Sequence, residues 1–391
     1  MQKRILALLS FGHMVTDINQ GLLPIFLTIL KEQMGLSYMA VGVVVMASNI
    51  SSSVIQPLFG YWSDRTSNRW LLPAGVFLAG AGMALAGLAP NFWSLLLAVL
   101  ISGLGIASYH PEASKTAHFA SGRLQASSMA IFSVGGNLGF GLGPLIAGAI
   151  LSYGGLKASP LLILPAALTA LLLWLSLPAI ARVIAAREAA EYTLTRQKEV
   201  KANAHLGGLV LLITIVILRS WLHAGLTNYI PLYYVNYLHG DPTFASTLLS
   251  IFLISGALGT LLGGRAADYW GPKKMILLSM AVMIPLVLIF PRAQGAWVVA
   301  VIAISGFFLI STFATTIVMA QALLPQYVGM ASGLMIGFAI GTGGVGVTFL
   351  GAIADRWGVP FTLSLMAAIP VLALILALFL PDLRRTPAQS Q

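Results

Sequence analysis

Long runs of apolar residues, separated by short polar segments, follow one another along almost the whole chain. Each run is close to the ~20 residues that an α-helix needs to cross a bilayer. A transmembrane β-barrel would instead show segments of about ten residues with alternating polarity. The pattern therefore predicts an all-α polytopic membrane protein with twelve transmembrane helices, at residues 5–30, 38–62, 71–89, 92–116, 124–152, 160–181, 206–234, 244–266, 273–291, 296–321, 327–353 and 360–380.

Composition agrees with this pattern. Of the 391 residues, 58% are hydrophobic and only 8% are charged, and the mean hydropathy is +0.91. Soluble domains carry about 25% charged residues. The absence of cysteine excludes disulfides and thiolate metal sites. The first residues, MQKR, lead into an apolar run without a small-residue cleavage site, so we expect a retained first helix and not a signal peptide.

The net charge of +10 arises from basic residues in the short segments between the spans. A nucleic-acid-binding protein would gather these residues on a water-facing surface, so we expect no nucleic-acid partner. If the N-terminus is cytoplasmic, sixteen of the 21 lysines and arginines face the cytoplasm, four face the other side, and Arg219 lies inside a span. This bias predicts a multi-pass protein of the bacterial inner membrane with both termini in the cytoplasm.

The longest polar stretch separates the sixth span from the seventh. It predicts an N-terminal six-helix bundle at 1–182, a charged and partly helical linker at 183–205, and a C-terminal six-helix bundle at 206–391. A partner-binding helix is the alternative for the linker. The halves resemble each other: GYWSD at 60–64 recurs as GRAAD at 264–268. Repeats of this kind predict two pseudo-symmetric bundles that give alternating access to a midplane site.

At these residues the whole chain resembles the major facilitator superfamily, whose loop after the second helix carries the signature Gly-x-x-x-Asp-Arg-x-Gly-Arg-Arg/Lys. The first copy departs from it at Ser67 and Asn68, and the second has Tyr269 in place of arginine. A carboxylate beside arginines can pair across bundles and stabilise a helix N-terminus. We interpret the motif as a gating latch, with plain topology signalling as the alternative. The matching residues are Gly60, Asp64, Arg65 and Arg69 in the first copy, and Gly264, Asp268, Gly271, Lys273 and Lys274 in the second.

The fifth span resembles the superfamily's antiporter signature, Gly-x-x-x-Gly-Pro-x-x-Gly-Gly. Small residues four positions apart let helices approach closely, and Pro144 leaves the carbonyl of Phe140 without its helical partner. Close packing alone explains such a pattern equally well, and the resemblance favours antiport. The matching gating residues are Gly139, Gly143, Pro144, Ala147 and Gly148.

The motif YHPEAS in the fourth span, followed by GGNLG in the fifth, resembles the fosmidomycin-resistance group of drug exporters. One position departs from many drug–proton antiporters, because Val99 stands where they carry an arginine. The part that this arginine plays in proton coupling must therefore be absent or moved to other groups.

Ionisable residues in the first and fourth spans are the candidates for proton coupling. His13 and Asp17 are four residues apart and share one helical face. An ionised side chain within a bilayer costs on the order of 2.5–3.5 kcal/mol, so such residues are usually functional. A carboxylate near histidines can exchange a proton near neutral pH. We expect Asp17 to carry the proton, with His13, His110 and Glu112 as partners. The alternatives are a hydrogen-bonded packing role for His13 and contact with water at a helix end for His110 and Glu112.

The seventh span repeats the four-residue spacing with Arg219 and His223. Arginine keeps its charge and suits an anionic substrate group, whereas His223 fits a packing role equally well. In the superfamily the first, fourth and seventh helices line the cavity, so the resemblance implies that these ionisable groups converge there. The expected substrate-binding residues are Arg219, His223, Asn49, Gln20, Asn137 and Asn228.

Other classes of function have little support. The sequence has no close cluster of histidine and aspartate like those of dedicated metal sites, so we expect no metal site, although a metal-cation carrier stays open. There is no Gly-x-x-x-x-Gly-Lys-Ser/Thr loop for ATP and no nucleophile with a base. We therefore expect no enzyme and no cofactor, with the proton gradient as the energy source.

These observations predict a monomeric, proton-coupled antiporter that exports a small polar or anionic organic compound or a drug of the fosmidomycin type, a role in drug efflux and antibiotic resistance. Two alternatives remain. One is a proton-driven uptake symporter on the same fold. The other is a membrane receptor that binds its ligand without moving it.

Overall fold

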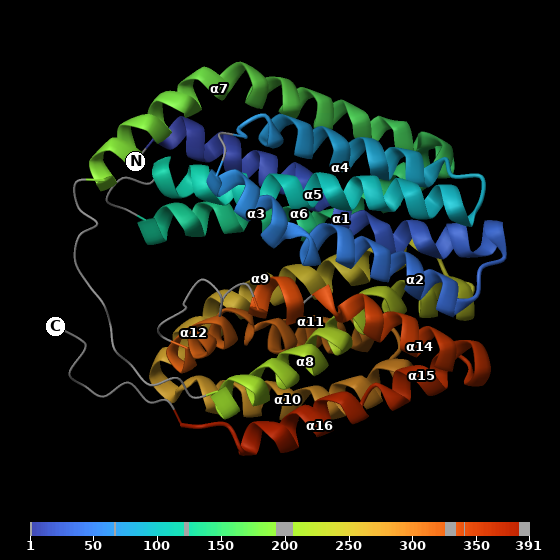
Figure 1. The fold of residues 1–391 in the computed structure, drawn as a ribbon. Coiled ribbons are helices and arrows are strands. Elements are labelled where there is room, and N and C mark those ends of the chain that lie inside the picture. The colour runs from blue at the N-terminus through green and yellow to red at the C-terminus, as the bar shows by residue number, and fades with distance from the viewer. Residues whose placement is uncertain are drawn as a thin grey trace. The chain divides into compact units, whose positions relative to one another are not determined.

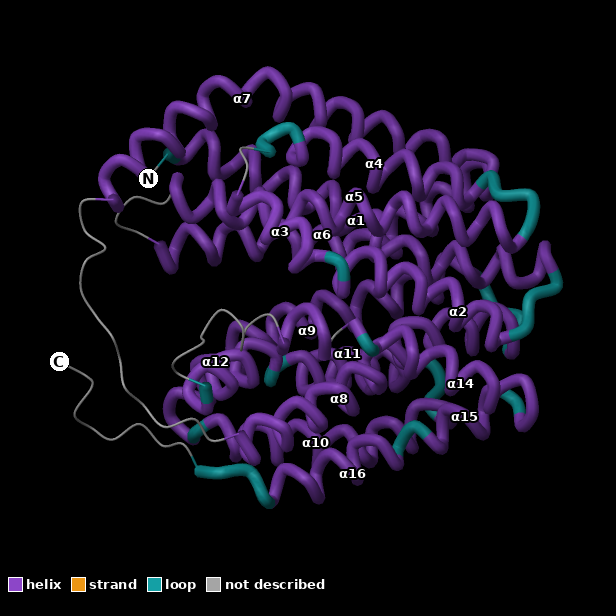
Figure 2. The backbone as a smooth tube through the Cα atoms, in the orientation of Figure 1, coloured by secondary structure: helices purple, strands orange, loops and turns teal. Residues whose placement is uncertain are grey.

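The computed structural model describes residues 2–65, 68–120, 125–192, 206–324, 334–339 and 341–382. These residues contain helices and loops and no strand, as Figure 2 shows. The first half comprises α1 (Lys3–Met34), α2 (Tyr38–Asn49), the π-helical turn η1 (Ile50–Val54), α3 (Gln56–Arg65), α4 (Leu71–Gly87), α5 (Phe92–Ala120), α6 (Gln125–Gly154), η2 (Gly155–Leu162) and α7 (Ile163–Tyr192). The second half comprises α8 (Leu206–Leu232), η3 (Tyr233–Tyr237), α9 (Pro242–Trp270), α10 (Pro272–Ile289), η4 (Phe290–Arg292), α11 (Ala296–Ile310), α12 (Phe313–Leu323), η6 (Leu334–Ala339), α14 (Gly343–Trp357), α15 (Val359–Leu365) and α16 (Ala368–Leu378).

The all-helical prediction is confirmed, and helix occupies each of the twelve predicted spans (Figure 1). Several spans are not continuous α-helices: η1 interrupts the second, and short breaks divide the tenth into α11 and α12 and the last into α15 and α16. Among the residues that the structure describes, eight helical stretches, one of which joins α6 to α7 through η2, have the length and hydropathy to cross a membrane. Helix α1 is not among them, because polar residues along it lower its hydropathy.

Local chemistry explains several helix ends. Helix α1 stops at Gly35, whose φ of 61° is the left-handed conformation that glycine adopts without strain. Asp241 caps the N-terminus of α9, and its carboxylate accepts hydrogen bonds from the amides of Thr243 (3.0 Å) and Phe244 (3.3 Å). Lys273 donates to the carbonyls of Leu378 and Leu380, both at 2.7 Å, and so caps the C-terminus of α16.

By its contacts the chain divides into two compact units. Unit 1 contains Met1–Gly35 and Ala47–Glu199, and unit 2 contains Leu36–Met46 and Val200–Gln391. Unit 2 therefore includes the first part of α2. The predicted linker at 183–205 begins as a continuation of α7, which runs to Tyr192, and its residues 193–205 lie outside the described part of the chain.

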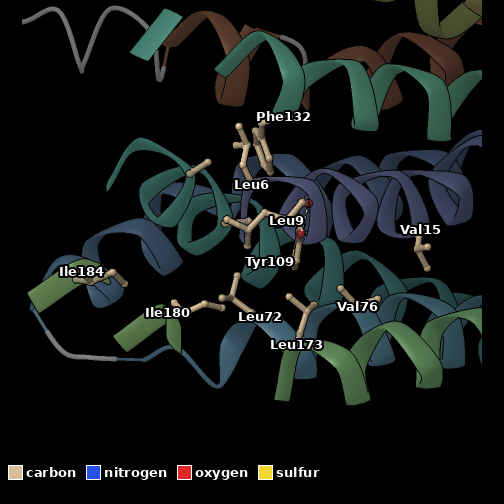
Figure 3. Packing of buried hydrophobic residues seen from close by; sticks show 12 residues of the cluster. Leu6, Leu9, Val15, Leu72, Val76, Tyr109, Phe132, Leu173, Ile180 and Ile184 are labelled. Atoms are coloured by element: carbon tan, nitrogen blue, oxygen red, sulfur yellow. Dashed lines mark hydrogen bonds between the residues drawn. The ribbon is translucent and has the colours of Figure 1, made fainter. Parts of the chain in front are cut away.

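The core of unit 1 is formed by apolar side chains of α1, α4, α5, α6 and α7. Figure 3 shows Leu9 and Tyr109 near its centre, and the hydroxyl of Tyr109 donates a 2.6 Å hydrogen bond to the carbonyl of Leu9. This bond pairs the polar end of a fully buried aromatic residue. It also links α5 to α1 at the level where both helices carry ionisable residues.

Glycines allow α6 to lie directly on α1. A Cβ atom at Gly143 would lie 2.6 Å from the carbonyl oxygen of Ile18 and 2.7 Å from the Cα of Gly21, and one at Gly139 would collide with the carbonyl of Met14. Real Cβ atoms do not approach backbone this closely, so larger residues would separate the helices. Glycines four positions apart are typical of such contacts between membrane helices.

Candidate functional site

Three ionisable side chains meet inside unit 1. The Nε2 atom of His13 lies 3.2 Å from Oδ2 of Asp17, and the Nε2 atom of His110 lies 2.9 Å from Oδ1 of the same carboxylate. The three polar groups lie within 4.8 Å of one another. Both of these ion-pair contacts end on Asp17. Within the described residues, neither a lysine nor an arginine forms an ion pair with the carboxylate of Asp17.

The folded helices bring this cluster together. His13 and Asp17 are one turn apart near the middle of α1, and His110 reaches them from α5. Gly136 of α6 leaves the necessary space, because a Cβ there would lie 2.8 Å from Oδ2 of Asp17 and 2.5 Å from Cε1 of His13. The ring of Phe132 stacks on that of His13, with centroids 4.2 Å apart. The cluster is thus enclosed by α1, α5 and α6.

Hydrogen-bond contacts at Nδ1 orient both imidazole rings. Nδ1 of His13 lies 2.9 Å from the carbonyl oxygen of Phe132. Nδ1 of His110 lies 3.2 Å from Nε2 of Gln56, which also donates to the carbonyl of Ser52 at 2.6 Å. Each histidine therefore uses Nδ1 for orientation and turns Nε2 toward Asp17.

These partners determine where hydrogens must lie. A carbonyl oxygen only accepts, so Nδ1 of His13 carries the hydrogen of its bond to Phe132. In a neutral ring Nε2 then holds a lone pair, and an ionised carboxylate offers only lone pairs as well. The 3.2 Å contact between His13 and Asp17 is therefore attractive only when a proton lies on one of them. The geometry of the pair thus suits one proton shared between the two side chains.

His110 completes this arrangement as a donor. The amide nitrogen of Gln56 faces Nδ1 of His110, so Nδ1 accepts this hydrogen bond. The neutral imidazole of His110 then carries its hydrogen on Nε2 and donates it to Asp17. Asp17 accepts this bond with one oxygen and faces His13 with the other. The cluster is neutral when His13 and Asp17 together hold the extra proton, and it carries one negative charge when they do not.

The fourth predicted coupling residue, Glu112, lies elsewhere on α5. Its side chain is buried, at 2% exposure, but it is not part of the three-residue cluster. Two residues along an α-helix correspond to about 200°, so Glu112 faces away from the side on which His110 meets Asp17.

Arg219 and His223 belong to unit 2 and form a separate group. The guanidinium of Arg219 is buried and donates from Nη1 to the hydroxyls of Thr312 (3.2 Å), which immediately precedes α12, and Thr316 (3.4 Å) within α12. Its Cζ lies 5.6 Å from the ring centroid of Phe313. His223 stacks on Phe252, with ring centroids 5.8 Å apart. Within the described residues Arg219 has no acidic partner, which leaves its charge available for an anion.

The other predicted substrate-binding residues differ in burial. Asn228 is buried on α8, where its Nδ2 donates to the carbonyl of Ala224 and its Oδ1 has no hydrogen-bond partner. Gln20 and Asn49 are half-buried, and Asn137 is exposed. The unpaired Oδ1 atom makes Asn228 a candidate for accepting a hydrogen bond from a ligand.

The predicted gating residues occupy several different settings. The side chains of Asp64, Arg65 and Asp268 lie outside the described part of the chain, so the latch stays a prediction. Gly60 and Gly264 lie in α3 and α9, Arg69 is half-buried just before α4, and Lys274 is exposed beside Lys273. Gly139 and Gly143 contact α1, while Pro144 and Gly148 are buried further along α6.

Several residues of the site were not identified from the sequence. Gln56, Gly136, Thr312 and Thr316 are polar or small residues in apolar spans, which is a weak but visible signal. The carbonyl of Phe132 is a backbone group and leaves no trace in the sequence.

Comparison with known proteins gives a consistent result. The sequence profile of the Major Facilitator Superfamily matches residues 9–239 and 229–391. The chain is 34% identical to the fosmidomycin resistance protein of Escherichia coli (strain K12) over 384 residues, which cover 97% of this chain and 93% of that protein. An uncharacterised transporter of the same superfamily from Bacillus subtilis (strain 168) is 33% identical over the same shares.

Solved structures extend the likeness to the fold. A bacterial homologue of the human lysosomal transporter Spinster superposes with a TM-score of 0.76 at 16% identity, covering 99% of both chains. The nucleoside transporter NupG superposes with a TM-score of 0.76 at 15% identity, covering 97% of this chain and 100% of its own.

Proposed function

We propose that this chain, which belongs to the Major Facilitator Superfamily, is a proton-coupled antiporter that exports a small polar or anionic organic compound of the fosmidomycin type. Its relatives and fold are those of multi-pass membrane transporters of small molecules and not of enzymes. The proposal adds the coupling ion, the direction and the substrate class.

The observation that carries the proposal is the proton site between His13 and Asp17. Asp17 has no basic partner other than histidine among the described residues, so its charge depends on whether the cluster holds a proton. Closing a low-dielectric cavity around an uncompensated ion costs more free energy than closing it around a neutral pair. Proton binding at this cluster therefore biases the equilibrium between access states, which is the requirement for coupling.

Arg219 supports an anionic substrate. It is a buried, permanent cation whose partners within the described part of the chain are two hydroxyls and an aromatic ring. The planar guanidinium matches carboxylate and phosphonate oxygens in a bidentate arrangement. The likeness to a fosmidomycin resistance protein supports a substrate of the fosmidomycin type.

The distribution of lysine and arginine supports cytoplasmic positions for both termini, and the bacterial relatives support an inner-membrane location. The protein functions as a monomer in this proposal, because one chain supplies both sets of ionisable residues. The latch of Asp64 and Arg65 acts on the cytoplasmic side.

Purified protein in liposomes tests the proposal, with a phosphonate, a sugar and a lipophilic cation as substrates. An antiporter moves protons and substrate in opposite directions, so an acidic lumen should drive accumulation of the phosphonate. A symporter would accumulate it with an alkaline lumen instead. Exchange that is indifferent to the pH gradient would refute proton coupling, and accumulation of only the sugar or the cation would refute the substrate class.

A further inference from the structure

We infer that His13, Asp17 and His110 also bind a single divalent transition-metal ion, with Zn²⁺ as the representative ligand. This binding requires neither a substrate nor transport. Two imidazole nitrogens and one carboxylate oxygen form a ligand set that suits zinc and its neighbours in the first transition row.

The positions of the ligand atoms fit such an ion. Bonds from zinc to nitrogen and oxygen are about 2.0–2.2 Å long, which places neighbouring ligand atoms roughly 3.3 Å apart in a tetrahedral site. The contacts of Asp17 with His13 and His110 measure 3.2 and 2.9 Å, and all three ligand atoms lie within 4.8 Å. Binding would draw the ligand atoms from within 4.8 Å of one another to about 3.3 Å, and three protein ligands leave the fourth tetrahedral position for water.

The hydrogen-bond partners of the two histidines also bear on metal binding. A histidine ligand usually donates its other N–H to a carbonyl or carboxylate, which fixes the ring and leaves the ligating nitrogen unprotonated. His13 does this with Nδ1 and the carbonyl of Phe132. Its Nε2 is thus already in the form that binds a metal. The Gln56 amide holds His110 in place through a nitrogen that also donates to the carbonyl of Ser52, so freeing Nε2 of His110 for a metal requires this amide to turn and give up its bond to Ser52.

Charge favours the ion as well. Within the described residues Asp17 has no lysine or arginine near it, so a cation entering the cluster meets one carboxylate and no competing positive side chain. Gly136 provides the room, because a side chain there would lie against both His13 and Asp17. The histidines that contact Asp17 are the only other titratable groups in hydrogen-bond contact with it in the part of the chain described.

An ion at this position lies between the His13 nitrogen and the Asp17 oxygens, the same place that the shared proton occupies. Zn²⁺ should therefore inhibit proton-driven transport, and this consequence alone rests on the proposed function.

Equilibrium titration of Zn²⁺ into purified, tag-free, full-length protein tests the inference, with a chromophoric chelator to report free metal. The chain contains six histidines, so a histidine tag must be removed and stoichiometry determined. We expect one ion per chain, and at least roughly tenfold weaker binding in His13→Gln and in His110→Gln, because even residues outside the ligand shell change metal affinity by 10–100-fold. The matched controls His223→Gln and His239→Gln should bind as the wild type does.

X-ray absorption spectra of the zinc-loaded protein should show two imidazole ligands. If His13→Gln does not purify as a monodisperse protein, His110→Gln carries the test. Binding that is absent, or that His110→Gln leaves unchanged, would overturn the inference. Zinc binding that depends on the cluster, in a protein whose transport ignores pH, would support the metal site and refute the proposed coupling.

Discussion

Asp355 accepts a 2.7 Å hydrogen bond from the backbone amide of Tyr38, although 317 residues separate the two. Its second carboxylate oxygen accepts from the amide of Met39 at 2.9 Å, and the hydroxyl of Ser37 accepts from Ala40 at 3.0 Å. The first three amides of α2 are thereby satisfied. A negative charge at a helix N-terminus is also favoured by the helix dipole. Within unit 2, α14 thus caps the start of α2 from a distant part of the chain.

Removal of this cap should destabilise the protein. We expect Asp355→Ala to lower the free energy of unfolding by ~0.5–2 kcal/mol, the usual cost of losing a helix cap. Asp355→Asn should lose less, because its amide oxygen still accepts one of the two bonds. Thermal unfolding of the detergent-solubilised variants measures the effect. Equal melting temperatures for Asp355→Ala and the wild type would show that the bonds contribute nothing.

Substitution of the carboxylate in the cluster should separate exchange from accumulation. Asp17→Asn removes the acid and cannot bind the shared proton, so we expect it to keep substrate exchange but to lose accumulation driven by a pH gradient. Parallel measurement of both fluxes in proteoliposomes decides this. Glu112→Gln is the matched control, because Glu112 is buried on α5 but lies outside the cluster. If Asp17→Asn still concentrates substrate and Glu112→Gln does not, the proton carrier is Glu112.

Arg219 should determine the affinity for anions. A hydrogen bond to a charged group contributes about 1.5–3 kcal/mol, so we expect Arg219→Gln to weaken phosphonate binding by roughly 10–100-fold. Arg219→Lys keeps the charge but loses the planar fork, and it should bind with intermediate affinity. Direct binding of the phosphonate and of a neutral ester analogue measures both. A loss of the same size for the neutral analogue would contradict an electrostatic role.

The contact of α6 with α1 should not tolerate a larger residue. Gly143→Leu would push its side chain into the backbone of Ile18 and Gly21, and overpacking of this kind costs about 1–3 kcal/mol or more. We expect lower thermal stability together with leak of protons or loss of coupling. Gly207→Ala is the control, because a Cβ there meets nothing within 4 Å. A stable and fully coupled Gly143→Leu protein would leave the motif without a sealing role.

Much of the fold was predictable because a bilayer imposes long apolar helices, and their number follows from the spacing of polar segments. The interruptions at η1 and between α11 and α12 were not, since π turns and short breaks follow from tertiary packing. For the site, the four-residue spacing of His13 and Asp17 identified a shared face. Their contact with His110, which is 93 residues from Asp17, depends on how α5 packs on α1.

The residues that position the cluster were harder to find. The role of Phe132 belongs to its carbonyl and not to its side chain, so any residue type could supply it. Glu112 shows the opposite problem, because its proximity to His110 in sequence does not bring it to the same face of α5.

The low hydropathy of α1 has a consequence for biogenesis. Apolar side chains drive the release of a nascent helix from the translocon into lipid, and a central aspartate opposes it. The glycine-lined surface of α6 and the imidazole of His110 on α5 accommodate the backbone and carboxylate of α1, yet both helices are synthesised after it. We therefore expect stable integration of α1 to be completed late, when the segments that enclose Asp17 have emerged from the ribosome. The carboxylate of Asp17 should thus make the first helix dependent on the fourth and fifth spans for insertion.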